Sequence, residues 1–98
     1  MTINKKLEGN VLNVALEGRL DTTTAPTLEE ELQGSLGGVE ELDFDFTTLE
    51  YISSAGLRVL LSAQKIMNKQ GKMIIRNVCS EIKEIFDVTG FADILTIV

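Results

Sequence analysis

The spacing of hydrophobic residues changes sharply in the middle of this sequence. From Leu42 to Phe46 apolar residues alternate with aspartates, a period of two that is typical of a strand with one buried face. From Leu57 to Met67 the apolar residues recur at helical spacing, with polar residues such as Arg58 between them. A long amphipathic helix that closely follows a half-buried strand must cover its apolar arc against a sheet, so the sequence predicts an α/β fold.

The N-terminus predicts a β-hairpin. The β-branched content of Val11–Leu16 is typical of a strand, and Ile3–Leu7 can pair with it as a second extended segment. Between them lie Gly9 and Asn10, residue types that tolerate the positive φ angles that tight hairpin turns require. We therefore expect two antiparallel strands at the start of the chain.

A helix is predicted next. Pro26 suits a first helical turn, where its missing N–H has no cost, and Thr24 precedes it as the expected cap. Leucines then recur at every fourth position, with glutamates between them, so one stripe faces a core and the acids face water. Gly37 and Gly38 are expected to end this helix.

The C-terminal third continues the alternation of strands and helices. Gly71 is expected to end the long helix and Met73–Arg76 to form a short strand. Ser80 is the expected cap of a third helix that exits at Gly90, and Ile94–Val98 is predicted as a last strand. The order is ββαβαβαβ.

Length and order together indicate one domain over residues 1–98. A chain of 98 residues lies within the usual range for a single core. Strands that alternate with helices after an antiparallel hairpin imply a mixed sheet whose later part is parallel. In such sheets ligands and partners tend to meet the loops at the carboxyl ends of the strands. A loop from Phe46 to Ser54 and the loop that carries Asp21 are expected to lie there.

Composition limits the partners. Fifteen acidic against nine basic residues give a net charge of −6, the wrong sign for a surface that collects the phosphates of nucleic acid. No uncharged apolar run approaches the roughly 20 residues of a membrane-spanning helix, and the N-terminus does not resemble a secretory signal. A lone cysteine, Cys79, is expected to be a buried apolar filler. We expect a cytoplasmic chain with a protein partner.

Residue types that support catalysis are scarce. The sequence has no histidine, which removes the usual general base and the commonest metal ligand, and no phosphate-binding loop. Asp43 and Asp45 would project from the same strand face and could in principle form an acid–base pair. Two exposed acids on the outer face of a strand are the simpler interpretation. We therefore expect no enzyme, no cofactor and no metal site.

Two serines stand at the start of the long helix. Ser53 and Ser54 can accept hydrogen bonds from the free N–H groups of the first turn, so capping is the structural interpretation. Phosphorylation is the functional one, because a phosphate would place close to two negative charges on the positive end of the helix dipole. Gly56 has two matching interpretations, close approach of a partner or tight packing on the sheet.

At this point the sequence resembles a known family, the STAS-domain anti-sigma factor antagonists of bacteria. The resemblance runs over nearly the whole chain and includes the family signature of two hydrophobic residues, Asp, Ser, a small residue, Gly and Leu. Four segments carry it in the family's order: Glu17–Asp21, Leu42–Phe46, Tyr51–Leu57 and Phe86–Phe91.

The resemblance implies a phosphorylation switch. The family's acceptor serine matches Ser54, with Ser53 as the alternative, and the modifying enzyme is an anti-sigma factor that is itself a serine kinase. Unphosphorylated protein would bind this kinase and free a sigma factor, and a serine phosphatase would restore it. Ser54 would lie between Asp21 and Asp45 at the strand ends, where a phosphate near their carboxylates would act by repulsion. The implied partner-binding residues are Asp21, Thr24, Asp45, Ser53, Ser54, Ala55, Gly56 and Leu57.

The sequence departs from the family at two places. Ser53 stands where Asp is usual, which favours an alternative function as a STAS subunit of another bacterial assembly, such as a lipid-transport complex, without a kinase. Many members continue beyond the position of Val98 into a helix that packs on the sheet. An apolar patch left open there would favour a partner or a homodimer.

Overall fold

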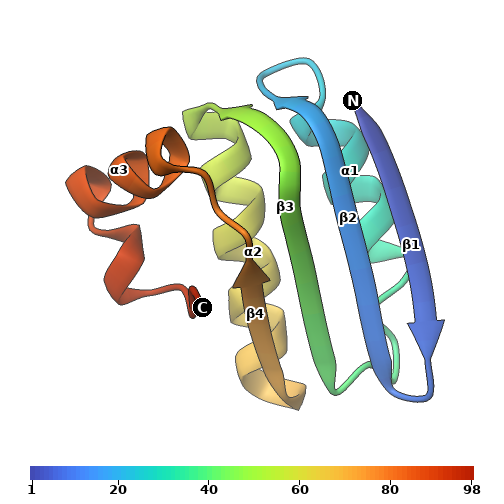
Figure 1. Ribbon diagram of the computed structural model, residues 1–98. Helices are drawn as coiled ribbons and strands as arrows, with labels where there is room; N and C mark the ends of the chain where they lie inside the picture. Colours follow the sequence, from blue (N-terminus) through green and yellow to red (C-terminus); the bar gives the residue numbers. More distant parts are fainter.

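A single four-stranded sheet organises the chain. The computed structural model describes all residues, 1–98, and the strands follow the order β1-β2-β3-β4 (Figure 1). β1 (Thr2–Glu8) and β2 (Val11–Leu20) are antiparallel, as predicted for the hairpin. β3 (Glu41–Ile52) runs parallel to β2, and β4 (Lys72–Arg76) runs parallel to β3. The predicted mixed sheet is therefore confirmed.

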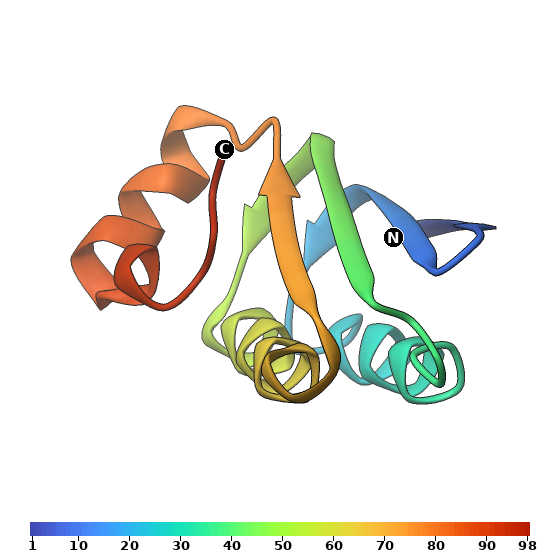
Figure 2. The ribbon, with the colours of Figure 1, turned by 90° about the horizontal axis from the view of Figure 1, so that it is seen from below.

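The helices are distributed unequally over the sheet. α1 (Ala25–Gln33) and α2 (Ser54–Gln70) lie side by side on one face, whereas α3 (Ser80–Thr89) lies beyond the β4 edge (Figure 2). A 3₁₀ turn, Phe91–Asp93, follows α3. Much of the opposite face of the sheet carries no helix. None of these helices is both long and apolar enough to cross a membrane.

The core lies between the sheet and the pair of helices. Leu42, Phe44 and Phe46 are fully buried, and the aspartates between them face the other way, which confirms the predicted alternation. The rings of Phe44 and Phe46 pack with their centroids 5.8 Å apart. α2 adds Leu60 and Met67 to the same core, both without exposed surface. The hydrophobic effect of this shared core fixes α2 on the sheet.

β3 is much longer than its alternating segment predicts. The strand continues from Phe46 to Ile52, where a loop was expected. The pairing of β2 with β3 shifts register twice, between Ala15 and Glu17 and between Gly18 and Arg19. Each shift is a bulge-like irregularity that breaks the period of two, so Phe46, Leu49 and Ile52 are buried at every third position.

Three other boundaries differ from the predictions. α1 ends at Gln33 with Gly34 as its C-cap, before Gly37 and Gly38. Ser80 is the first residue of α3 and not its cap, which is Cys79. Ile94–Val98 forms no strand, because only Ile97 bridges to Ile75 of β4. The end of α2 at Gly71 and the left-handed Gly90 after α3 are as predicted.

Candidate functional site

Ser53 anchors the junction between β3 and α2. Its N–H donates to the carbonyl oxygen of Leu20 at 2.9 Å, which joins it to the end of β2. Its carbonyl oxygen accepts from the N–H of Leu57 at 2.9 Å, and its hydroxyl accepts from the N–H of Gly56 at 3.4 Å. Ser53 has extended φ and ψ angles and is the N-cap of α2. The capping interpretation therefore applies to Ser53.

Ser54 is the first residue of α2 and is exposed. Its hydroxyl makes no hydrogen bond within the protein, whereas that of Ser53 is engaged in the cap. The positive end of the helix dipole lies beside a residue in this position. The structure thus separates the two serines, one structural and one free.

Gly56 lies beneath this surface. A Cβ at this position would lie 2.7 Å from Cγ of Leu20 and 2.9 Å from Cγ1 of Ile52, closer than real carbon atoms approach. The first turn of α2 therefore rests directly on the ends of β2 and β3, and the packing interpretation of Gly56 holds. Leu57 is also buried. Both residues lie beneath the exposed surface of the site.

Asp21 organises the loop between β2 and α1. Its Oδ1 accepts hydrogen bonds from the N–H and the hydroxyl of Thr23 at 3.0 and 2.8 Å and from the N–H of Thr24 at 3.1 Å. These bonds, that of the Thr23 hydroxyl foremost, hold the pKa of the Asp21 carboxyl below its usual value. Because Leu20 bonds to Ser53, this loop lies next to the start of α2.

Thr24 occupies the N-cap position of α1 but makes no capping bond to the first turn. Its hydroxyl accepts from the N–H of Asp21 at 2.8 Å and can donate to the carbonyl oxygen of Arg19, also at 2.8 Å. The predicted cap is therefore a loop-closing residue. It holds Asp21 in place and ties the loop back to the end of β2.

An exposed pair that the sequence did not single out lies beside this loop. The guanidinium of Arg19 stacks on the ring of Tyr51, 4.2 Å from its centroid, and its Nε is 3.8 Å from Oδ2 of Asp21. Arg19 and Tyr51 are paired across β2 and β3. The sequence signal that could have found this pair is Tyr51, an aromatic residue three positions before Ser54. Together they form a polar and aromatic surface at the carboxyl ends of β2 and β3.

Asp45 does not lie at the carboxyl end of its strand, where we expected it. It lies in the middle of β3, because the strand continues from Phe46 to Ile52. Its Oδ1 accepts from the N–H of Thr47 at 3.0 Å and from Nδ2 of Asn77 at 3.0 Å. Bonds from Thr47 and Asn77, that of the Thr47 hydroxyl foremost, lower the pKa of Asp45. The expected arrangement of Ser54 between Asp21 and Asp45 at the strand ends is therefore wrong.

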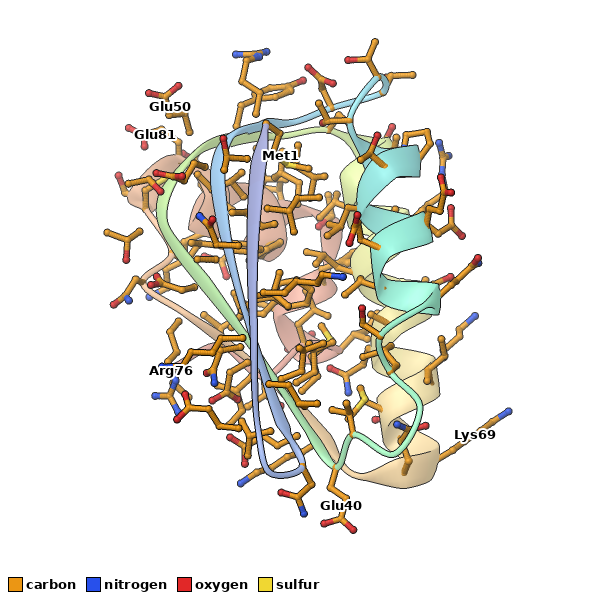
Figure 3. The ribbon with its side chains drawn as sticks, turned by 90° about the vertical axis from the view of Figure 1, so that its right-hand side faces the viewer. Met1, Glu40, Glu50, Lys69, Arg76 and Glu81 are labelled. Atoms are coloured by element: carbon orange, nitrogen blue, oxygen red, sulfur yellow. The ribbon has the colours of Figure 1, made fainter.

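Asp43 lies on the open face of the sheet with different neighbours. Its Oδ2 is 3.9 Å from the guanidinium of Arg76, which projects from the face opposite α1 and α2 (Figure 3). Burial raises the pKa of Asp43, and the neighbouring Glu41 carboxyl raises it further. Asp43 and Asp45 thus have separate partners. No group of three potential metal ligands is present in the chain.

Comparison with known proteins identifies the family. The STAS domain profile matches residues 2–98. A putative anti-sigma factor antagonist of Bordetella bronchiseptica, BtrV, is 34% identical over 94 residues, which cover 94% of this chain and 80% of that protein. The chain belongs to the STAS domain family.

Solved structures share the fold. The crystal structure of an anti-sigma factor antagonist from Mycobacterium paratuberculosis has a TM-score of 0.88 at 21% identity and covers 98% of this chain and 83% of that one. The Bacillus cell fate determinant SpoIIAA in its phosphorylated form has a TM-score of 0.78 at 16% identity, covering 99% of this chain and 91% of that one. At these identities the likeness concerns the fold.

Proposed function

We propose that this protein is an anti-sigma factor antagonist that is switched off by phosphorylation of Ser54. The observation that carries the proposal is the division of roles between two adjacent serines. Ser53 is committed to the helix cap, and Ser54 is exposed with a hydroxyl that has no partner in the protein. The relative BtrV is named a putative anti-sigma factor antagonist, which supports the same class of function for this protein.

The unphosphorylated form binds an anti-sigma factor that is a serine kinase, and the sigma factor is released. The kinase supplies ATP. Oγ of Ser54 attacks the γ-phosphorus, the new O–P bond forms as the bond to the β-phosphate oxygen breaks, ADP leaves, and the hydroxyl proton passes to a base of the kinase. The modified protein then dissociates, because a doubly charged group disrupts complementarity at the interface. A serine phosphatase hydrolyses the phosphoester and restores the hydroxyl.

The contact surface is the exposed part of the site. Asp21, Ser54 and Ala55 surround the start of α2, and we add the exposed pair of Arg19 and Tyr51. Arg and Tyr are residue types that commonly anchor protein interfaces. Thr24 and Ser53 hold this surface in shape, as do the buried Gly56 and Leu57 beneath it. Asp45 lies outside it, in the middle of β3.

Serine in place of the family's usual aspartate at position 53 is compatible with this function. Ser and Asp are both strong N-cap residues, since each offers a side-chain oxygen to a first-turn N–H. Ser53 makes this bond to Gly56. The substitution therefore removes a charge next to Ser54 and keeps the geometry that presents its hydroxyl.

Intact mass spectrometry tests the proposal. The wild type is incubated with ATP and the anti-sigma factor kinase of the same organism, in parallel with Ser54→Ala and the matched control Ser53→Ala. We expect one added phosphate on the wild type and on S53A, and none on S54A. Peptide mapping then locates the phosphate.

Two results would overturn the assignment. Modification of S54A at full extent would move the acceptor to another residue. Absence of any phosphorylated form in cells, together with co-purification of a membrane transporter, would favour the alternative of a STAS subunit in another assembly.

A further inference from the structure

The second turn of α2 begins with a cation that has no partner. Arg58 is exposed, and its guanidinium makes no ion pair, hydrogen bond or aromatic stack in the structure. It lines a cavity of about 460 Å³ between α1 and α2, together with Ala55 and Pro26. Among the cations near the proposed acceptor, Arg58 is the free one, because Arg19 is already stacked on Tyr51 and lies beside Asp21.

Helix geometry brings Arg58 to Ser54. The two residues are separated by four positions, so their Cβ atoms lie roughly 5–6 Å apart on one face of the helix. The Cα–Cβ bonds of a helix tilt toward its N-terminus, which directs the side chain of Arg58 over the turn that carries Ser54. An acidic group N-terminal to a basic one at this spacing is also the more favourable order. A phosphate on Ser54 is therefore within reach of the guanidinium.

The acidic groups around Arg58 leave it available. Glu29 of α1 lines the same cavity, but it forms no ion pair with Arg58. The carboxylate of Asp21 accepts its hydrogen bonds from Thr23 and Thr24 and has Arg19 beside Oδ2. A phosphoserine carries close to two negative charges and pairs more strongly with a guanidinium than one carboxylate does.

We propose that Arg58 is the internal counter-ion of phosphorylated Ser54. In the unphosphorylated protein its guanidinium is free to contact the partner. In the phosphorylated protein it turns to the phosphate and is withdrawn from the partner surface. Phosphorylation then acts twice, by adding charge at Ser54 and by removing an available cation. This inference rests on the proposed function in one respect, namely that Ser54 is phosphorylated in cells.

The test installs phosphoserine at position 54 by genetic code expansion, without any kinase, and follows its ³¹P resonance during a pH titration. The second pKa of phosphoserine is near 6. We expect it to lie about 0.5 lower in the wild-type background than in R58Q, because the cation favours the dianion. R58K is expected to retain most of the shift. K65Q is the charge-matched control, because it removes Lys65, an exposed cation two turns further along α2. Its phosphate pKa should match that of the wild type.

Two outcomes would overturn the inference: equal phosphate pKa values in the wild type and R58Q, or a change in K65Q as large as that in R58Q. The far-ultraviolet circular dichroism of each variant confirms that α2 is intact. The experiment is separate from the test of the proposed function. If the phosphate pKa depends on Arg58 but no kinase modifies Ser54, the pairing of Arg58 with the phosphate is supported and the phosphorylation switch is refuted. If the kinase modifies Ser54 but the phosphate pKa does not depend on Arg58, the switch is supported and the pairing is refuted.

Discussion

The two ends of α2 are held to the rest of the protein in different ways. At the C-terminal end, Nε2 of Gln70 donates to the carbonyl oxygens of Leu36 and Val39 at 2.7 and 2.6 Å. Gly71 follows and lies so close to Glu40 that a Cβ would be 1.7 Å from the Glu40 carbonyl oxygen. This end is fixed against main-chain atoms, which cannot move without displacing the strand that follows.

The N-terminal end has one main-chain bond, from Ser53 to Leu20, and otherwise packs on side chains. Gly56 contacts Leu20 and Ile52, whose side chains can shift, and the cap is a single hydroxyl of Ser53. The hydroxyl of Ser54, which follows Ser53, makes no hydrogen bond within the protein. We therefore expect the C-terminal end of α2 to contribute more to stability than the N-terminal end, which carries the exposed Ser54. Four measurements test whether the two ends of α2 differ in this way.

Gly71→Ala is expected to have the largest effect. Its Cβ would overlap the carbonyl group of Glu40, and the backbone must move to relieve the contact. We expect a loss of at least about 3 kcal/mol in the free energy of unfolding. Urea denaturation followed by circular dichroism measures it. A loss below that of Gly56→Ala would contradict the assignment of stability to this end.

Gly56→Ala is expected to cost less, about 1–2 kcal/mol, because the methyl group meets flexible side chains of Leu20 and Ile52 and alanine is the better helix former. The same denaturation experiment ranks it against G71A. Because the first turn must lift from the sheet, we also expect slower phosphorylation of Ser54 by the kinase. An unchanged rate would mean that the position of this turn is not critical for the switch.

Ser53→Ala is expected to lower stability by about 1 kcal/mol through loss of the cap, and Ser54→Ala to stay within about 0.5 kcal/mol of the wild type. Ser53→Asp restores an oxygen to the same position and should recover the loss. Thermal unfolding of the three variants measures the order. Equal losses in S53A and S54A would show that the two hydroxyls do not have the separate roles assigned to them.

The smallest expected effect is the pH dependence of the stability that Asp21 contributes. Its pKa in the folded protein lies below its unfolded value, which is about 3.9. The stabilisation is therefore present above that pH and is lost as the pH falls through the folded pKa. Asp21→Asn should be less stable than the wild type at pH 7, and the gap should close in acid. Asp87→Asn, an exposed aspartate on α3, is the matched control, and an equal gap there would contradict the prediction.

The sequence predicted the regular elements well and their irregular ends poorly. The alternation from Leu42 to Phe46 predicted its strand, but the register shifts beside β2 change the burial period afterwards, and no local pattern announces them. The extension of β3 to Ile52 was missed for this reason, and so Asp45 was expected too close to Ser54. The segment from Ile94 to Val98 has the composition of a strand, but only Ile97 forms a β-bridge, with Ile75 of β4, so no strand forms.

The composition and periodicity of the sequence determined the α/β class, the hairpin, the long helix, and the location of two serines at its start. These features are local, since they follow from spacing and residue type within a few turns or strand positions. Which serine is free was decided only by the tertiary structure. That choice depends on the bond from Ser53 to Leu20, on the contact of Gly56 with two strand ends, and on the loop that Asp21 closes. The first two join Ser53 and Gly56 to Leu20, which is distant in the chain, so their outcome depends on packing, which the local sequence does not encode.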